Sequence, residues 1–162
     1  MPCGTKVHFC LRLLPALIPV MTERKTRVAI VDDEATVRKA LCRLLSASNL
    51  AAETFPSGQA FLNSLAIQQP DCVVLDLHMP GLSGLDVLQR LSSVAATLPT
   101  IVITAYDEPD AELKCIAAGA SAYLRKPLDD ETLLATVARA LAAGNGSGRR
   151  DSGRITGVGA GI

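Results

Sequence analysis

Four short apolar runs in this sequence each end in a side chain that could do chemistry. These ends carry the pair Asp32-Asp33, Asp76, Thr104 and the pair Lys126-Pro127. Three carboxylates brought together repel one another unless a cation lies among them, and a hard divalent ion such as Mg²⁺ suits their oxygens. With a lysine to neutralise a phosphoryl group and a hydroxyl to donate to it, the set predicts a site that holds a phosphoryl group on Asp76.

Each of these residues alone also has an ordinary structural explanation. An aspartate after a strand more often caps a helix, and a Lys-Pro pair is common in turns. The combination is what carries the hypothesis, because Asp76 follows Asp33 by 43 residues, Thr104 follows 28 later and Lys126 another 22 later. We therefore interpret the four groups as one site.

An alternation of strand and helix patterns would bring these groups together. Runs rich in branched apolar residues predict five strands, over residues 27–32, 50–54, 71–76, 100–104 and 121–124. Apolar residues at helical spacing predict five helices, over residues 35–45, 57–65, 85–91, 111–118 and 129–143. Such an alternation makes parallel βαβ units, so we expect an α/β fold with a doubly wound five-stranded parallel sheet. Functional groups in such sheets collect at the carboxyl ends of the strands.

The composition excludes several classes of protein. The chain has 162 residues, of which 49% are hydrophobic, which is ample for a packed core. No apolar run reaches the roughly 18–20 residues of a membrane helix. A net charge of zero argues against direct binding to DNA, which favours a basic excess. The five cysteines are scattered without a C-x-x-C pair, which is typical of reduced thiols in a cytoplasmic protein.

Charge and glycine content divide the chain into three segments. We expect an N-terminal extension, an acidic folded domain and a flexible glycine-rich tail, over residues 1–25, 26–143 and 144–162. The middle segment has nine Lys/Arg against fourteen Asp/Glu, and the last holds seven of the twelve glycines. Three interpretations of the extension stay open: natural translation from Met21, a disordered extension, or a targeting segment.

Together these motifs resemble the receiver domain of bacterial two-component response regulators. The segments that carry the resemblance are Val31–Glu34, Leu75–Gly84, Ile103–Ala105 and Lys126–Pro127. Within this family the chain is similar to receivers attached to transcription factors of the nitrogen-fixation regulator type. The resemblance covers residues 26–143 and implies a flavodoxin-like (βα)5 fold.

The resemblance implies that Asp76 takes a phosphoryl group from the histidine of a sensor kinase. It implies that Asp33 and Asp76 bind Mg²⁺, with the backbone carbonyl of His78 as the third protein ligand. Asp32 matches the acid that orients a metal-bound water from outside the ligand set. We expect the His78 side chain only to border the site, with capture of a transition metal as the alternative.

The resemblance also assigns roles to the residues that neutralise and sense the phosphoryl group. Lys126 matches the lysine that pairs with a phosphoryl oxygen, and its bond to Pro127 is expected to be cis. Thr104 matches the hydroxyl that moves onto the phosphoryl group, and Tyr123 matches the aromatic side chain that turns in response. Tyr106 flanks the phosphoryl position in the family and is expected to shield it from water.

We therefore expect a regulatory phosphoacceptor rather than an enzyme. Its output would be a face of the fourth helix, fifth strand and fifth helix that forms a homodimer or binds a downstream protein. The family's two-domain members continue into a DNA-binding helix-turn-helix, whereas nothing after Ala143 has the length or periodicity for one. The chain is then either a stand-alone receiver or one that lacks its output domain.

Two other functions are alternatives to this expectation. A Mg²⁺-dependent phosphatase would also gather carboxylates at strand ends. Phosphatases that resemble haloacid dehalogenases, however, carry a second aspartate two residues after the nucleophile, where this chain has His78. A protein-interaction module that works without phosphorylation is the other alternative, and the intact Asp33, Asp76, Thr104 and Lys126 weigh against it.

Overall fold

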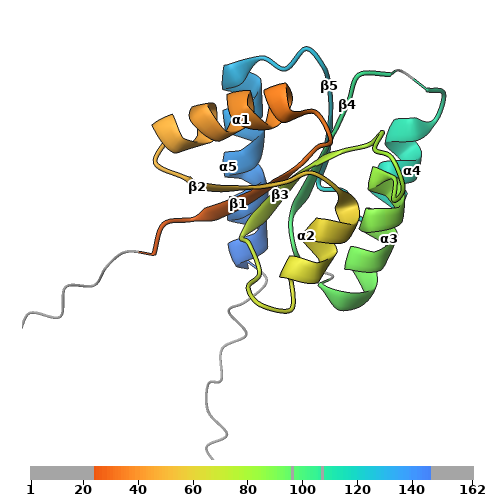
Figure 1. The fold of residues 1–162 in the computed structure, drawn as a ribbon, viewed down its shortest axis with the longest axis horizontal. Helices are drawn as coiled ribbons and strands as arrows, with labels where there is room; N and C mark the ends of the chain where they lie inside the picture. The colour runs from red at the N-terminus through yellow and green to blue at the C-terminus, as the bar shows by residue number, and fades with distance from the viewer. Residues whose placement is uncertain (1–23, 96, 107, 147–162) are drawn as a thin grey trace, which may run out of the picture.

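Strands and helices alternate along the whole of the described chain. The structure, a computed structural model, describes residues 24–95, 97–106 and 108–146 (Figure 1). The strands are β1 (Arg27–Val31), β2 (Ala51–Phe55), β3 (Cys72–Asp76), β4 (Thr100–Thr104) and β5 (Ala122–Arg125). The helices are α1 (Ala35–Ala47), α2 (Gly58–Ser64), α3 (Gly84–Val94), α4 (Ala111–Ala117) and α5 (Asp130–Gly146).

The strands form one parallel sheet in the order β2-β1-β3-β4-β5. This confirms the predicted doubly wound sheet. The order reverses between β1 and β3, which lie side by side in the middle of the sheet. Val31 of β1 pairs with Leu75 of β3, and Asp76 pairs with Ile103 of β4. The carboxyl ends of the three central strands are therefore level with one another, where ligands of such sheets bind.

Each face of the sheet is covered by its own helices. Figure 1 shows α1 and α5 on one face and α2, α3 and α4 on the other. Successive side chains of a strand point to opposite faces, so both faces of a central strand must be apolar. In β1, Val28 and Ile30 pack with α1 and α5, while Ala29 and Val31 pack with α2, α3 and α4. This explains why the strands appear in the sequence as continuous apolar runs.

Short polar residues fix where two of the helices begin. The Ser57 hydroxyl accepts a hydrogen bond from the Ala60 amide at the start of α2. At α3, Ser83 and Asp86 satisfy each other's backbone amides in a capping box. Gly119, just after α4, has φ +105°, as expected for a left-handed helix end.

The last helix differs from its predicted extent. α5 runs to Gly146, three residues past the end predicted at Ala143. A Cβ atom on Gly144 would lie 2.7 Å from the Pro99 side chain, so the absent side chain lets the helix pack closely there. The rest of the predicted tail, and nearly all of the predicted extension, lie outside the described residues. Among the residues that the structure describes, no helix is long and apolar enough to cross a membrane.

The turn after β3 depends on the absence of a side chain at Gly84. The Gly84 amide donates a 2.8 Å hydrogen bond to the Leu77 carbonyl, which folds the loop back onto the strand end. A Cβ atom here would lie 2.8 Å from the Leu77 Cα and closer still to the Asp76 carbonyl oxygen. Both obstacles are backbone atoms, so a rotamer change cannot relieve the clash.

We therefore expect Gly84→Ala to lower the free energy of unfolding by about 2–3 kcal/mol, because overpacking against backbone forces the strand end to move. Urea unfolding followed by circular dichroism measures this loss. Gly81→Ala is the matched control: Gly81 has φ +80° but nothing within 4 Å of the added atom, so only strain of about 1 kcal/mol is expected. Equal losses in the two variants would contradict the steric explanation.

Candidate functional site

Three carboxylates meet at the carboxyl ends of the two central strands. Asp32 and Asp33 follow β1 directly, and Asp76 is the last residue of β3. One oxygen from each of the three lies within 4.8 Å of the others. Asp32 is fully buried and Asp76 is 4% exposed, whereas Asp33 faces solvent. The parallel pairing of β1 with β3 is what brings residues from two distant parts of the chain to this point.

Lys126 reaches this cluster from the loop after β5. Its Nζ lies 2.9 Å from Asp32 Oδ2 and 3.2 Å from Asp76 Oδ1. The lysine side chain is only 14% exposed. Its backbone amide donates to the carbonyl of Thr104, and its peptide bond with Pro127 is cis. One ammonium group therefore touches two of the three carboxylates.

The charges in this cluster oppose one another. Burial raises the pKa of the Asp76 carboxyl, the Lys126 charge works against that rise, and the Asp32 and Asp33 charges add to it. For Lys126, burial acts to lower the pKa, but hydrogen bonds and charge from Asp32 and Asp76 outweigh it and leave the pKa raised. The ammonium is therefore held in its charged form, and the cluster as a whole still carries more negative than positive groups.

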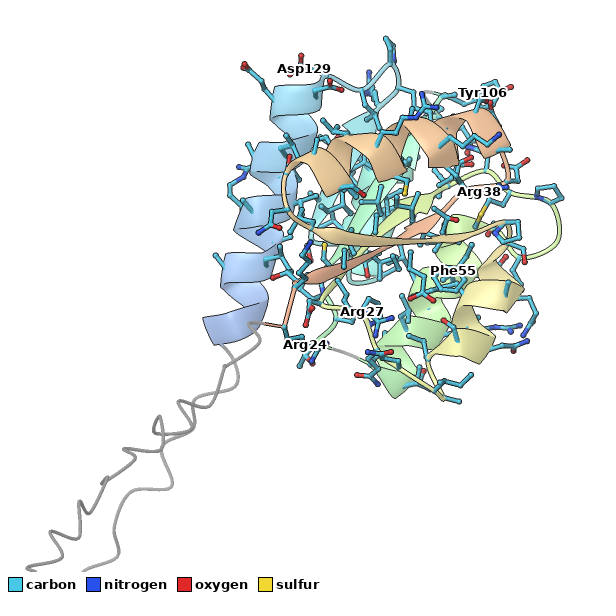
Figure 2. All side chains as sticks on the ribbon, turned by 60° about the vertical axis from the view of Figure 1, so that its left-hand side comes forward. Arg24, Arg27, Arg38, Phe55, Tyr106 and Asp129 are labelled. Carbon is cyan, nitrogen blue, oxygen red and sulfur yellow. The ribbon has the colours of Figure 1, made fainter. Side chains whose placement is uncertain are left out.

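Backbone contacts hold the two adjacent aspartates in place. The Glu34 amide donates to Asp32 Oδ1 at 2.8 Å. The Arg38 guanidinium donates to the carbonyl oxygens of Asp32 and Asp33, at 2.6 and 2.8 Å. Figure 2 shows Arg38 on the same side of the molecule as Tyr106 and away from Arg24. Arg38 could not be identified from the sequence, since a basic residue on an exposed helix face has no distinguishing pattern.

Thr104 ends β4 beside Asp76, but its hydroxyl is engaged elsewhere. The side chain is fully buried. Its Oγ1 lies 3.1 Å from His78 Nδ1, accepts from the Tyr106 amide at 3.2 Å and lies 3.2 Å from the Tyr106 carbonyl. Among the described residues, its hydrogen bonds go to these two partners and not to Asp76. The structure thus places Thr104 at the predicted edge of the sheet without joining it to the carboxylates.

The His78 ring links the end of β4 to the loop that follows it. Its Nε2 lies 3.0 Å from Glu108 Oε1, in addition to the contact between Nδ1 and Thr104. The ring also meets the Tyr106 ring edge to face, with centroids 5.2 Å apart. The His78 side chain thus contacts Thr104, one of the predicted site residues. Glu108 was not foreseen, because a loop carboxylate carries no sequence signal.

Tyr123 lies outside the charged cluster. It is on β5, paired with Val102 of β4, and packs against the core on the α2, α3 and α4 face. Its hydroxyl oxygen is buried. The ring is therefore one strand away from Thr104, within the same packed layer.

The donor set of the cluster fits a hard divalent cation. Ionised carboxylates are purely hydrogen-bond acceptors, so three of them cannot satisfy one another. Lys126 supplies a single positive charge against the three carboxylates. Two added positive charges would balance the group, and oxygen is the ligand atom that Mg²⁺ prefers.

Comparison with known proteins agrees with this geometry. The response regulator receiver domain family matches residues 28–138. The transcriptional regulatory protein FixJ of Azorhizobium caulinodans is 34% identical over 127 residues, covering 78% of this chain and 60% of FixJ. The DNA-binding transcriptional regulator NtrC of Klebsiella pneumoniae is 38% identical over 112 residues, covering 69% of this chain.

The chain spans only part of these relatives, since the match covers 24% of NtrC. Among solved structures, the beryllofluoride-activated receiver domain of DrrB is 30% identical with a TM-score of 0.67, over 74% of this chain and 99% of that one. The similarity therefore corresponds to a whole receiver domain and to one part of the longer regulators.

The crowded charges predict a stability effect. Because the pKa of Asp76 is raised by folding, its ionisation costs stability, and this cost appears as the pH rises through the raised pKa. We expect Asp76→Asn to raise the free energy of unfolding at pH 7 without Mg²⁺. The advantage over the parent protein should shrink at about pH 3, below the ordinary pKa of 3.8, where the carboxyl is mostly protonated in both states. Urea unfolding at both pH values measures it.

Asp86→Asn is the control with the opposite sign. Hydrogen bonds from Ser83 lower the pKa of Asp86, so its charge stabilises the fold above that pKa. This variant should lose stability at pH 7. A loss of stability in Asp76→Asn as well would show that Asp76 is well compensated without a metal.

Proposed function

This chain belongs to the response regulator receiver family, and we propose that it accepts a phosphoryl group on Asp76 from the histidine of a sensor kinase. Receivers are regulatory phosphoacceptors rather than enzymes. The observation that carries the proposal is the Lys126 ammonium, 3.2 Å from Asp76 and 2.9 Å from Asp32 inside a buried acidic cluster. A lysine in this position can neutralise a phosphoryl oxygen without any rearrangement of the fold.

The proposed transfer is a simple displacement at phosphorus. An Asp76 carboxylate oxygen forms a bond to the phosphorus of the kinase phosphohistidine, the phosphorus–nitrogen bond breaks, and its electron pair returns to the imidazole. The product is an acyl phosphate, whose added negative charge needs compensation in a buried place. Lys126 supplies part of that compensation, and its existing contact with Asp32 keeps it aimed at the site.

We assign the metal ligands within the same proposal. Asp33 and Asp76, together with the backbone carbonyl of His78, would hold Mg²⁺, and Asp32 would orient a bound water from outside the ligand set. When bound, Mg²⁺ supplies positive charge to the phosphoryl oxygens. The support for this assignment is the close approach of the three carboxylates and the solvent exposure of Asp33.

The proposed output is a change of surface on α4, β5 and α5. Thr104 would move onto the phosphoryl group, and Tyr123 would turn in response. Leu113 and Ile116 of α4 are 69% and 46% exposed, so this helix already presents apolar side chains that a partner could cover. The partner would be a second copy of the chain or a downstream protein, with the sensor histidine kinase as the phosphoryl donor.

The proposal places the protein in the cytoplasm with residues 26–143 as its receiver domain. Cys42, Cys72 and Cys115 are free thiols. Burial raises the pKa of Cys72 to about 12, which keeps this thiol protonated and unreactive. Unpaired cysteines of this kind fit a reducing compartment.

We expect acetyl phosphate with Mg²⁺ to add one phosphoryl group to the protein, detected by intact-protein mass spectrometry. Asp76→Asn should abolish the addition, because the amide nitrogen and oxygen cannot form the acyl phosphate. Asp129→Asn, at the start of α5, is the control that should label normally. Unchanged labelling of Asp76→Asn would assign the phosphoryl group to another residue.

Metal binding should depend on Asp33 more than on Asp32. A residue that orients a metal ligand from outside typically changes affinity by about 10–100-fold, whereas a lost ligand costs more. Calorimetric titration of Mg²⁺ into Asp33→Ala and Asp32→Ala compares the two directly. If both variants lost the same affinity, the division of roles between ligand and orienting acid would be wrong.

A further inference from the structure

The His78 side chain forms a hydrogen-bonded bridge that the proposed transfer does not use. One ring nitrogen contacts the buried Thr104 hydroxyl at 3.1 Å, and the other contacts the Glu108 carboxylate at 3.0 Å. Thr104 is fully buried, whereas the Glu108 side chain is 61% exposed. The bridge therefore joins the interior of the site to the loop between β4 and α4.

The chemistry of the three groups sets the direction of these hydrogen bonds. A carboxylate only accepts, so the Nε2 facing Glu108 carries a proton. In the neutral ring Nδ1 is then an acceptor, which receives the Thr104 hydroxyl proton. The Tyr106 amide donates to the same Thr104 oxygen at 3.2 Å. The neutral imidazole with Nε2 protonated can thus pair with both Thr104 and Glu108, while the Tyr106 carbonyl competes with Nδ1 for the Thr104 proton.

Thr104 has only one hydroxyl proton to give. In this structure its two acceptors are His78 Nδ1 and the Tyr106 carbonyl oxygen, and neither belongs to Asp76. A phosphoryl group on Asp76 would compete with them for that single proton. Whatever strengthens the present arrangement therefore opposes the movement of the hydroxyl.

We propose that His78 is a positioning residue that holds the Thr104 hydroxyl away from Asp76 until a phosphoryl group displaces it. This inference rests on the proposed function and deepens it by naming what restrains the switch. When the Thr104 proton turns to the phosphoryl group, His78 Nδ1 loses its donor, and the ring no longer ties Thr104 to Glu108.

The bridge leads directly to the start of α4. The Glu108 carbonyl accepts a hydrogen bond from the Ala111 amide at 3.2 Å, in the first turn of the helix. Asp110, the residue before the helix, has φ +64° and its side chain makes no capping hydrogen bond. With no cap of its own, this end of α4 relies on the loop for its position. Release of Glu108 by His78 would loosen the helix that carries Leu113 and Ile116.

The test uses beryllofluoride, which forms a phosphoryl-like adduct on the acceptor carboxylate, in the presence of Mg²⁺. Binding to the full chain is followed by NMR. We expect His78→Phe to bind about two- to tenfold more tightly than the parent protein, because one net hydrogen bond that opposes the switch is lost. Phenylalanine keeps an aromatic ring against Tyr106 but has no ring nitrogen.

A variant without the Thr104 hydroxyl distinguishes positioning of that hydroxyl by His78 from an effect of the packing of the His78 ring. In Thr104→Val there is no hydroxyl to restrain, so adding His78→Phe should leave the affinity unchanged. His78→Gln keeps one acceptor and one donor on a single side chain and should restore part of the parent behaviour. Glu108→Gln keeps an acceptor for the ring and serves as the matched control, with less than about a twofold change expected at this exposed position.

Each outcome decides a different question. Unchanged affinity in His78→Phe would overturn the inference while leaving the proposed function intact. An equal gain in the Thr104→Val background would mean that the ring acts by shielding Asp76, which also overturns it. If the parent protein bound no beryllofluoride, the proposed function would fail and the inference with it. Should His78→Phe not fold, His78→Ala takes its place in the same cycle.

Discussion

The Lys126 ammonium contacts the Asp32 and Asp76 carboxylates in a part of the protein that is almost closed to solvent. The strands and loops around this contact must be arranged so that the three side chains can reach one another. Two buried carboxylates without a counter-charge would destabilise the fold, since burying an unpaired charge is expensive. The Lys126 side chain must therefore reach the carboxylates from beyond β4, and the conformation of the loop after β5 must allow this contact. Even so, the cluster keeps an excess of acid, which leaves a place for a cation and for chemistry.

The sheet supplies the geometry that this contact needs. The reversal of strand order between β1 and β3 brings the Asp32-Asp33 turn beside Asp76, and the run β3-β4-β5 sets Thr104 and then Lys126 along the same edge. The helices on the two faces bury almost every residue of the three central strands, whereas the edge strands β2 and β5 stay partly exposed. The carboxylates, the hydroxyl and the lysine of the site thus lie at or just after the ends of strands in one sheet.

Much of this could be predicted from the sequence, because apolar runs and helical spacing repeat strongly along residues 27–143. The doubly wound parallel sheet and the convergence of Asp32, Asp33, Asp76 and Lys126 at one edge follow from how parallel units pack. Arg38 and Glu108 could not be foreseen, since each is one polar residue on an exposed segment whose partner depends on the final side-chain arrangement. The extension of α5 to Gly146 was missed because glycine alone indicates a helix end, whereas here its small size allows contact with Pro99.

The separation of 94 residues between Asp32 and Lys126 has a consequence for biosynthesis. A ribosome releases the acidic residues of β1 and β3 well before it has made the lysine that compensates them. A nascent chain that ends before β5 therefore holds its carboxylates without their counter-charge and leaves β4 as an uncovered sheet edge. The fifth strand completes the sheet, and Lys126 compensates the acidic cluster, only when the last fifth of the domain has emerged from the ribosome.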